Sequence, residues 1–237
     1  MTNLRIYIIL IRQDMNERYE RNIGAITQAE QELLKIKRVA IIGCGGLGCY
    51  IAELLARLGL GHLTLVDGDV YAASNLNRQL YSLETNLGIN KTSETRERLL
   101  KIRSDLSIKT FDIILNEENS RTILKDHDLI IDALDNVKTR LLVEKIANEL
   151  GTVLVHGAVK EWFAQISTVF PGDFTLSTLY QSDLELERPS VLAFTPAFCA
   201  TIQVSEALKV LLNKDNLLRR KLFFADLRNG SFEIIDL

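Results

Sequence analysis

The residues with the clearest chemical potential are glycines that directly follow a run of apolar residues. Residues 39–42 are all apolar and predict a buried strand, and Gly43, Gly45 and Gly48 follow with the spacing GxGxxG. The amphipathic run 49–60 then predicts a helix. A strand, a glycine-rich turn and a helix in this order direct backbone N–H groups and a helix N-terminus to one point, where phosphate binds. The pattern predicts a nucleotide site without saying which nucleotide binds.

An acidic residue ends the next predicted strand. Residues 62–67 predict a buried strand that ends at Asp67, about 20 residues beyond the glycine turn, where a carboxylate accepts hydrogen bonds from ribose hydroxyls. The glycines and Asp67 together still fit NAD and ATP equally well.

Two basic residues and a second acid favour ATP. The polar segment 74–79 contains Arg78, and Lys91 begins a helical pattern. A triphosphate needs such cations near its β- and γ-phosphates, whereas the glycine turn largely serves the pyrophosphate of NAD. Asp135 follows an apolar strand and is expected at the same edge of a parallel sheet, where a carboxylate beside phosphates is a natural Mg²⁺ ligand. The nearby Asp132 is expected to be structural.

The bulk composition excludes several classes of protein. The chain has 237 residues, 47% hydrophobic and 25% charged, with a formal net charge of −3. This charge argues against binding nucleic acid by bulk electrostatics. The cysteines form no CxxC pair, which suits a reducing compartment, and the apolar run 6–11 is too short to span a membrane. We therefore expect a soluble, cytoplasmic protein with no membrane association.

The order of predicted elements indicates an α/β fold. We expect a Rossmann-like, mostly parallel sheet with helices on both faces, extended by antiparallel strands in the C-terminal third. One domain is expected, with a nucleotide-binding half at about 38–157 and a second part, which holds the antiparallel strands, at about 158–237. A short strand or arm is expected at 1–13. The remaining strands are predicted at 108–115, 129–136, 153–156, 162–170, 222–225 and 231–235. The remaining helices are predicted at 16–37, 91–103, 117–125, 137–150 and 195–212, and a long loop at 171–193.

With these residues in place, the chain from about residue 16 onward resembles the ThiF/MoeB/HesA adenylyltransferases, prokaryotic relatives of the ubiquitin-activating enzymes. The resemblance rests on Arg18-Tyr19-Glu20-Arg21, the glycines 43–48, Asp67-Gly68-Asp69, the segment 74–79, Lys91 and Asp135-Asn136. It implies that an ATP site is lined by Gly43, Gly45, Gly46, Gly48, Asp67, Asp69, Ser74, Asn75, Leu76, Asn77, Arg78, Gln79, Lys91, Asp135 and Asn136.

The resemblance also implies partners. Family members are usually homodimers in which the residue matching Arg21 reaches into the other subunit's site. The loop 171–193 looks like the crossover loop under which the C-terminal Gly-Gly tail of a small ubiquitin-like sulfur carrier threads. Many relatives hold zinc with two CxxC pairs, and some carry a cysteine in the crossover loop; this chain has neither feature. We expect no zinc site.

The implied reaction is ATP-dependent adenylation of the carrier's terminal carboxylate, with release of pyrophosphate and Mg²⁺ as the metal. Arg21, Arg78, Lys91 and Asp135 would act on charge and alignment. Adenylation of a peptide or a modified tRNA, an NAD-dependent oxidoreductase and a non-catalytic scaffold remain as alternatives. The carrier and its pathway are left open.

The remaining reactive side chains have no assigned role in the chemistry. Cys44 is expected to fit the tight turn, and Cys199 to fill the core, so that no thioester forms on the enzyme. The three histidines (His62, His127 and His156) and Trp162 are interpreted as packing residues.

Overall fold

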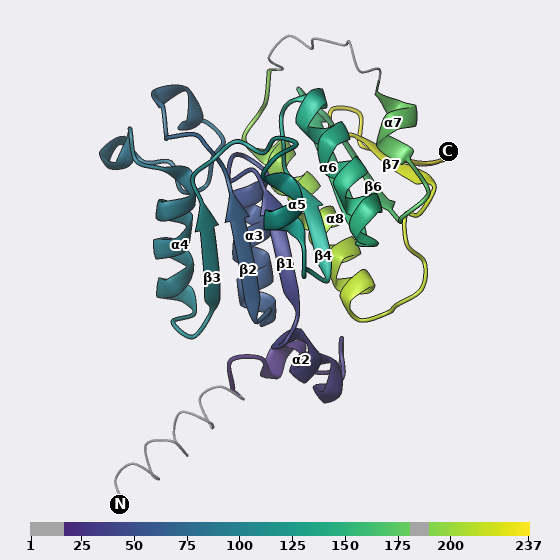
Figure 1. Cartoon of the computed structure of the whole chain (residues 1–237), viewed down its shortest axis with the longest axis horizontal. Coiled ribbons are helices and arrows are strands. Elements are labelled where there is room, and N and C mark those ends of the chain that lie inside the picture. Colours follow the sequence, from purple (N-terminus) through teal and green to yellow (C-terminus); the bar gives the residue numbers. More distant parts are fainter. Residues whose placement is uncertain (1–16, 181–189) are drawn as a thin grey trace, which may run out of the picture.

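A computed structural model describes residues 17–180 and 190–237. Within these ranges one sheet of eight strands runs in the order β3-β2-β1-β4-β5-β6-β7-β8 (Figure 1). The first five strands along the chain are parallel, and β6, β7 and β8 continue the sheet as antiparallel strands. This confirms the predicted fold class. The strands are β1 (Arg38–Ile42), β2 (His62–Val66), β3 (Ser107–Phe111), β4 (Leu129–Asp132), β5 (Leu154–Lys160), β6 (Phe163–Val169), β7 (Lys221–Asp226) and β8 (Ser231–Asp236).

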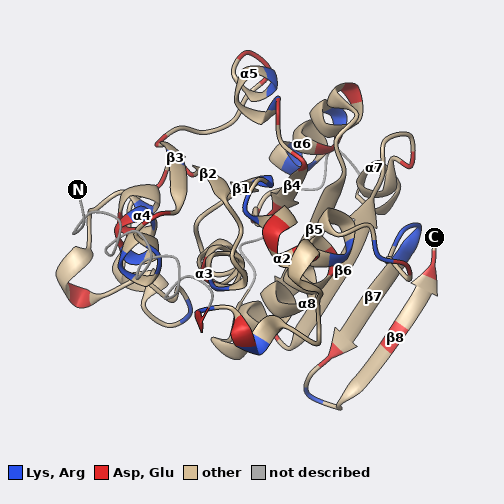
Figure 2. Ribbon diagram, turned by 90° about the horizontal axis from the view of Figure 1, so that it is seen from below, with Lys and Arg blue, Asp and Glu red and all other residues tan. Residues whose placement is uncertain are grey.

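Helices cover both faces of the parallel part of the sheet. They are α2 (Gln28–Leu34), α3 (Gly48–Leu58), α4 (Lys91–Ile102), α5 (Ser120–Leu124), α6 (Val137–Leu150), α7 (Thr175–Leu179) and α8 (Phe194–Leu211), with short 3-10 turns η1 (Glu20–Asn22), η2 (Ala73–Asn75) and η3 (Glu84–Asn86). Helix α4 carries charges of both signs along its length (Figure 2).

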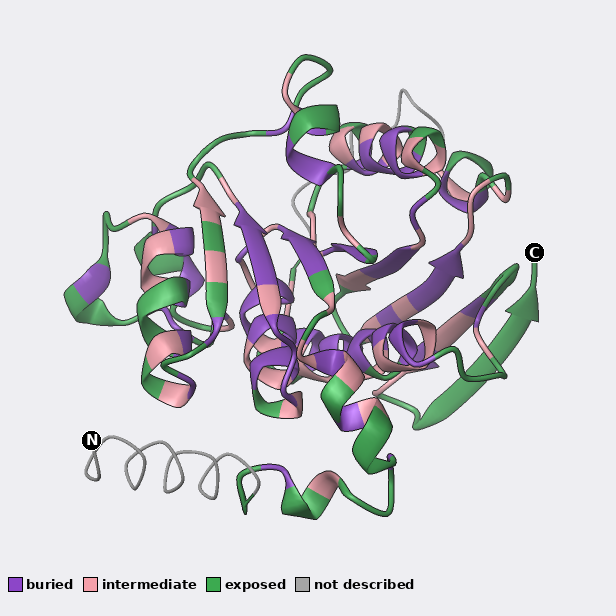
Figure 3. Ribbon diagram, turned by 60° about the horizontal axis from the view of Figure 1, so that its bottom comes forward, coloured by how far each residue is buried: buried purple, intermediate pink, exposed green. Residues whose placement is uncertain are grey.

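The core has two layers because successive residues of a strand point to opposite faces. Val39 and Ile41 of β1 pack with α3, α4 and α8 in one layer. Ala40 and Ile42 pack with α5, α6 and α7 in the other layer. A strand buried on both faces is apolar throughout, as 39–42 is, and the central strands are accordingly the buried part of the sheet (Figure 3).

The chain reverses its direction of travel across the sheet beside β1. From β1 the chain adds β2 and then β3 on one side, and it returns to place β4 on the other side. Ligands of open α/β sheets bind in the crevice outside the carboxyl ends of the strands at such a reversal. The glycine turn follows β1, and Asp135 lies in the segment between β4 and α6. The topology therefore brings both to one edge.

The C-terminal strands form an exposed extension. The two predicted C-terminal strands form a hairpin around Asn229-Gly230, with β7 and β8 paired from Lys221–Asp236 to Asp226–Ser231. All residues of β8 are exposed (Figure 3). Among them Phe232 stacks on Phe223 and Phe198 with ring centroids 6.1 and 5.8 Å apart, so one aromatic cluster ties this edge to α8.

Several predicted elements are wrong in extent. The run 16–37 is not one helix, because after η1 the backbone turns at Gly24 with φ +107°, and α2 starts afresh at a capping box formed by Thr27 and Glu30. The loop 171–193 contains the short helix α7.

Several strands also end at other residues than predicted, because hydrogen-bonded pairing with the neighbouring strand, rather than apolar character, determines where a strand ends. β3 ends at Phe111 and β4 at Asp132, short of the predicted 115 and 136, while β5 continues to Lys160 through its pairing with β6. The predicted arm 1–13 and residues 181–189 of the predicted loop 171–193 lie outside the described residues. In the described ranges, no helix combines the length and apolar character needed to cross a membrane.

Candidate functional site

Two glycines of the turn after β1 are required by close backbone contacts. Gly43 has φ +98°, and a Cβ there would lie 2.5 Å from the carbonyl oxygen of Ala133. A Cβ on Gly48 would lie 1.8 Å from the carbonyl oxygen of Gly43. Both positions exclude larger residues, because real Cβ atoms do not approach so closely. They fix the turn against the end of β4 and against the start of α3.

The other two glycines form an open face. A Cβ on Gly45 would meet the Nε2 of Gln79 at 3.5 Å, and one on Gly46 would meet Pro196 at 3.5 Å and Arg78 at 3.8 Å, which are ordinary contacts. The glycine turn therefore lies against the polar segment 74–79 and the first turn of α8.

One amide oxygen beside this face has no partner. Gln79 is 6% exposed, and its Oε1 is buried and forms no hydrogen bond within the described residues. Because buried polar atoms are nearly always satisfied, an unpaired amide oxygen beside a glycine turn is a group that a ligand can satisfy. The residues present therefore fit a bound nucleotide.

Asp67 braces the turn through both carboxylate oxygens. Its Oδ2 accepts from the backbone N–H of Cys44 at 2.7 Å, and its Oδ1 accepts from that of Asp69 at 2.8 Å. Burial raises the pKa of this carboxyl group, while Lys91 and the two N–H groups act in the opposite direction. Asp67 lies beside the turn as expected, and its predicted contact with a ribose stays a prediction.

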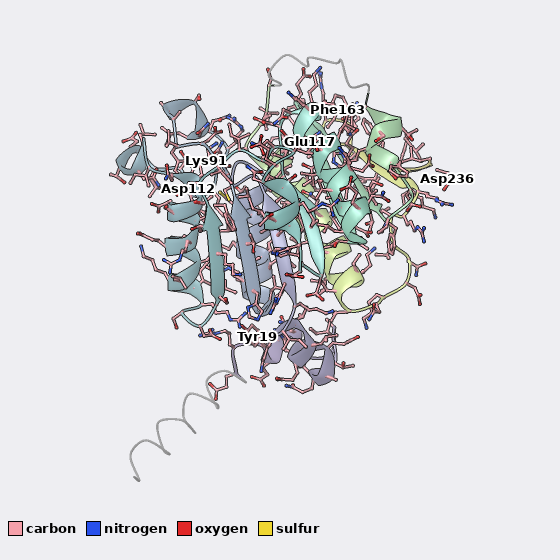
Figure 4. The ribbon with its side chains drawn as sticks, viewed as in Figure 1. Tyr19, Lys91, Asp112, Glu117, Phe163 and Asp236 are labelled. Carbon is pink, nitrogen blue, oxygen red and sulfur yellow. The ribbon has the colours of Figure 1, made fainter. Side chains whose placement is uncertain are left out.

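Lys91 is the buried cation of the site. Its Nζ donates to Oδ2 of Asp69 at 2.8 Å, and its backbone N–H donates to the carbonyl of Asp69 at 3.1 Å. Figure 4 shows Lys91 at the end of α4 that lies toward the glycine turn. The first turn of α4 is held further by Asn90 and Thr92, whose side chains donate to the carboxylate of Asp112.

Arg78 is half-buried and folded onto its own segment. Its Nη1 donates to the carbonyl of Ser74 and to Oδ1 of Asn77, both at 2.8 Å. Asn77 in turn donates through Nδ2 to the carbonyl of Val191 at 3.1 Å, just before α8. These bonds join the polar segment to the approach to α8, while the Cγ atom of Arg78 lies beside Gly46.

Other residues of the segment 74–79 have structural contacts. Asn75 is buried, and its Oδ1 accepts from the backbone N–H of Ala72 at 3.0 Å, so its side chain shapes η2. Ser74 contributes its backbone carbonyl to Arg78, and Leu76 is largely exposed. A nucleotide contact for these three residues remains a prediction.

Asp135 and Asn136 lie in the turn between β4 and α6. Asn136 is the N-cap of α6, with its Oδ1 accepting from the N–H of Thr139 at 2.9 Å. Asp135 is exposed and makes no hydrogen bond or ion pair to another described residue. Within the described ranges no three His, Cys, Asp or Glu side chains are grouped to hold a metal. One carboxylate with phosphates and water is nevertheless the usual way in which Mg²⁺ is bound.

Arg21 is not brought to this site by its own chain. It lies in η1, which follows Tyr19, and Tyr19 packs at Gly59 beyond the far end of α3. Because α3 has 11 residues, it separates the two regions by about 16 Å. Figure 4 shows Tyr19 and Lys91 at opposite ends of the sheet.

The three cysteines are fully buried. Cys49 donates its thiol to the carbonyl of Cys44 at 2.9 Å. Burial raises the pKa of Cys49 to about 11 and raises the pKa values of Cys44 and Cys199 as well. At neutral pH all three are therefore thiols rather than thiolates.

Two of the three histidines make side-chain hydrogen bonds that the packing interpretation missed, and that of His156 is buried. His127 bonds to Oγ1 of Thr64 at 2.8 Å, and Nδ1 of His156 bonds to Oδ2 of Asp132 at 2.6 Å. Sequence reasoning also missed Pro196 as a neighbour of the glycine turn; its only signal is its place at the start of a predicted helix.

Comparisons with known proteins agree with this geometry. A profile of the ThiF family matches residues 19–237. A SAMP-activating enzyme E1 from Haloferax volcanii is 30% identical over 227 residues, covering 92% of this chain and 84% of that protein. A molybdopterin-synthase adenylyltransferase from Haemophilus influenzae is 33% identical over 217 residues, covering 88% of this chain and 89% of that protein. A longer relative, the adenylyltransferase and sulfurtransferase MOCS3 from Xenopus laevis, is 34% identical over 81% of this chain, which corresponds to 45% of its own length.

Solved structures share the fold. The crystal structure of E. coli MccB with ATP has a TM-score of 0.81 at 22% identity, covering 93% of this chain and 71% of that one. The structure of PaaA has a TM-score of 0.79 at 22% identity, covering 94% of this chain and 73% of that one. The family profile covers residues 19–237, and two relatives at least 30% identical cover most of this chain, so this chain belongs to the ThiF family.

Proposed function

We propose that this protein is an adenylyltransferase that uses ATP to adenylate the C-terminal carboxylate of a small ubiquitin-like sulfur carrier and releases pyrophosphate. The named adenylyltransferase and activating-enzyme relatives support this assignment. The observation that carries it is the convergence of an open glycine face, the unpaired amide oxygen of Gln79 and the cations of Arg78 and Lys91.

Adenylation requires that the carboxylate be aligned with the α-phosphorus of ATP and that the negative charge on the phosphates be neutralised. The carrier's carboxylate attacks the α-phosphorus of ATP, forming the acyl-adenylate bond as the bond to pyrophosphate breaks. Lys91 and Arg78 stabilise the charge on the phosphates, because donors fixed in advance lose no reorganisation energy during the reaction. The backbone N–H groups of the glycine turn and the N-terminus of α3 bind phosphate. Asp67 accepts from the ribose.

Asp135 is the residue that would hold Mg²⁺. When bound, this ion neutralises phosphate charge and holds the leaving group in line. The exposed carboxylate of Asp135, at the same edge of the sheet as the glycine turn, suits this role.

Different parts of the chain are proposed to bind the nucleotide and the carrier. The residues proposed to bind nucleotide come mainly from 38–157, and we assign the antiparallel part at 158–237 to the carrier. Because the length of α3, about 16 Å, separates the region of Arg21 from the glycine turn of its own chain, we infer that Arg21 assists catalysis from a second copy. We therefore propose a homodimer in which Arg21 enters the partner's site.

Calorimetric titration with Mg-ATP and with NAD tests the assignment. We expect binding of Mg-ATP and none of NAD, followed by ATP–pyrophosphate exchange that depends on an added carrier ending in Gly-Gly. Tight NAD binding without an ATP signal would make the protein an oxidoreductase. Exchange with a short peptide but with no carrier protein would instead favour the peptide alternative.

A further inference from the structure

Two charged side chains hold the backbone immediately before Asp135. Oδ1 of Asp132 accepts from the backbone N–H of Leu134 at 2.9 Å, and Nη2 of Arg140 donates to the carbonyl of the same residue. Both polar groups of one peptide segment are therefore bound by side chains from β4 and α6. Asp132 is fully buried and Arg140 is 6% exposed, so this contact lies inside the protein.

The two side chains belong to a larger buried network. Oδ2 of Asp132 lies 3.5 Å from Nε of Arg140 and 2.6 Å from Nδ1 of His156. Burial lowers the pKa of His156, which makes the neutral ring the resident form. Its Nδ1–H then donates to Asp132, and its Nε2 accepts from the hydroxyl of Tyr180 at 3.1 Å.

The Tyr180 hydroxyl is satisfied by three partners. It donates to His156 and accepts from Nη1 of Arg140 at 3.1 Å and from Nε2 of Gln165. The guanidinium of Arg140 also lies over the Tyr180 ring, 5.6 Å from its centroid. Among the buried side-chain atoms of this network, only Nε of Arg140 forms no hydrogen bond within the described residues. A displacement of the other groups would leave further buried polar atoms without a partner, so the network favours one geometry.

The segment that this network fixes lies beyond the regular strand. β4 ends at Asp132, and just after it the N–H of Ala133 donates to the carbonyl of Ile42 at 2.9 Å. Leu134 is next, and Asp135 follows it. The backbone position of Asp135 therefore depends on the contacts of Asp132 and Arg140 to Leu134.

We propose that Arg140 and Asp132, supported by His156 and Tyr180, are positioning residues that place the Asp135 carboxylate toward the nucleotide. The effect on nucleotide binding rests on the proposed function, whereas the effect on the backbone at 133–136 does not. Arg140 and Asp132 touch the segment before Asp135 and act only through it.

The test compares two buried arginines. Arg140→Lys keeps the positive charge but removes the fork that reaches Leu134 and Tyr180 together. The matched control is Arg103→Lys, because Arg103 is 5% exposed, donates to the carbonyl of Leu60 and pairs with Asp105 at the other end of the sheet. Hydrogen exchange of the unliganded protein should be faster at 133–136 in Arg140→Lys and unchanged there in Arg103→Lys.

Binding supplies the second readout. We expect Arg140→Lys to weaken Mg-ATP binding about 10–100-fold and to raise the Mg²⁺ concentration needed for binding, as loss of a residue supporting a metal ligand typically does. Arg103→Lys should change neither quantity. Combined with Asp135→Asn, the Arg140→Lys change should cause no further loss, since both act through one carboxylate.

The outcomes separate the two proposals. Two results would overturn the positioning role. One is an unchanged rate of hydrogen exchange at 133–136 in a folded Arg140→Lys protein. The other is a loss of Mg-ATP affinity in the double variant that equals the product of the two single losses. If Arg140→Lys does not fold, Tyr180→Phe takes its place, with Tyr81→Phe as its control because the Tyr81 hydroxyl donates only to Glu53 among the described residues. A wild-type protein that binds no ATP would refute the proposed function, while hydrogen exchange would still decide the positioning role.

Discussion

Lys91 Nζ lies 2.8 Å from Oδ2 of Asp69, but the two side chains differ sharply in exposure: 7% for Lys91 and 66% for Asp69. The pair thus joins a buried ammonium group to a carboxylate at the surface. Burying an unpaired charge is costly, and Asp69 offsets that cost while the site is empty. A phosphate oxygen that replaces Asp69 as the partner of Lys91 would gain a cation already in place.

The first prediction concerns this cation. Lys91→Ala should lower carrier-dependent ATP–pyrophosphate exchange by about 10²–10³-fold, because loss of one fixed donor at a developing anion has this effect. The matched control is Lys101→Ala, an exposed lysine in the last turn of the same helix. Its exchange rate should equal that of the wild type. Near-normal exchange in a folded Lys91→Ala protein would remove Lys91 from the mechanism.

Arg78 gives an independent prediction at the other side of the glycine turn. Arg78→Ala should also reduce exchange by about 10²–10³-fold. Because the Arg78 guanidinium bonds to Ser74 and Asn77, part of the loss could come from the shape of the segment 74–79. Arg78→Lys separates the two causes: it keeps a cation, and recovery of exchange would assign the effect to charge. Wild-type exchange in Arg78→Ala would show that this residue is a surface charge.

Replacement by alanine should affect stability at one glycine of the turn and Mg-ATP binding at another. Gly48→Ala forces a Cβ to within 1.8 Å of the Gly43 carbonyl oxygen and should lower the free energy of unfolding by about 1–3 kcal/mol or more. Gly46→Ala makes only ordinary contacts, so its stability should stay within about 0.5 kcal/mol while Mg-ATP binding weakens. Urea unfolding and calorimetry measure the two effects. Equal stability losses would contradict this division.

Much of the fold was predictable because apolar runs and glycines determine it locally. The buried strand at 39–42 and the glycine spacing predicted β1 and the turn, and the structure places Asp67 beside that turn through bonds to Cys44 and Asp69. The helix from 137 to 150 was predicted with its bounds intact, because Gly151 with φ +69° ends it.

The contacts that sequence reasoning missed join distant segments. His156 was interpreted as packing, yet it is hydrogen-bonded to Asp132, 24 residues away. No local pattern indicates such a bond, because it depends on β4 and β5 being neighbours in register. The distance of Arg21 from the glycine turn of its own chain is another property set by long-range packing, because it follows from the position of η1 beyond the far end of α3.

The role proposed for Arg21 can be tested by mixing subunits. Arg21→Ala and Lys91→Ala proteins should each be nearly inactive, and a mixture should recover part of the exchange activity. Recovery is expected because one site of a mixed dimer keeps both side chains. Native mass spectrometry verifies that the subunits have exchanged. Absence of recovery in a verified mixed dimer would mean that Arg21 does not act across the interface.

The last prediction is that the reaction ends at the adenylate and that the carrier is never held on the enzyme as a thioester. A thioester requires an accessible thiolate near the carboxylate under attack. Cys44, Cys49 and Cys199 are fully buried, and burial raises the pKa of each thiol above its usual value, so the fraction of thiolate at neutral pH is small.

Intact-mass spectrometry under non-reducing conditions distinguishes the products. With enzyme, Mg-ATP and the cognate carrier, the expected species are the carrier–AMP adduct and unmodified enzyme. The control is a protein with all three cysteines replaced by alanine or serine, provided that it remains folded; its adenylate yield should match that of the wild type. A carrier–enzyme adduct that dithiothreitol removes, and that one cysteine substitution abolishes, would show that a buried thiol becomes exposed during the reaction and takes part in it.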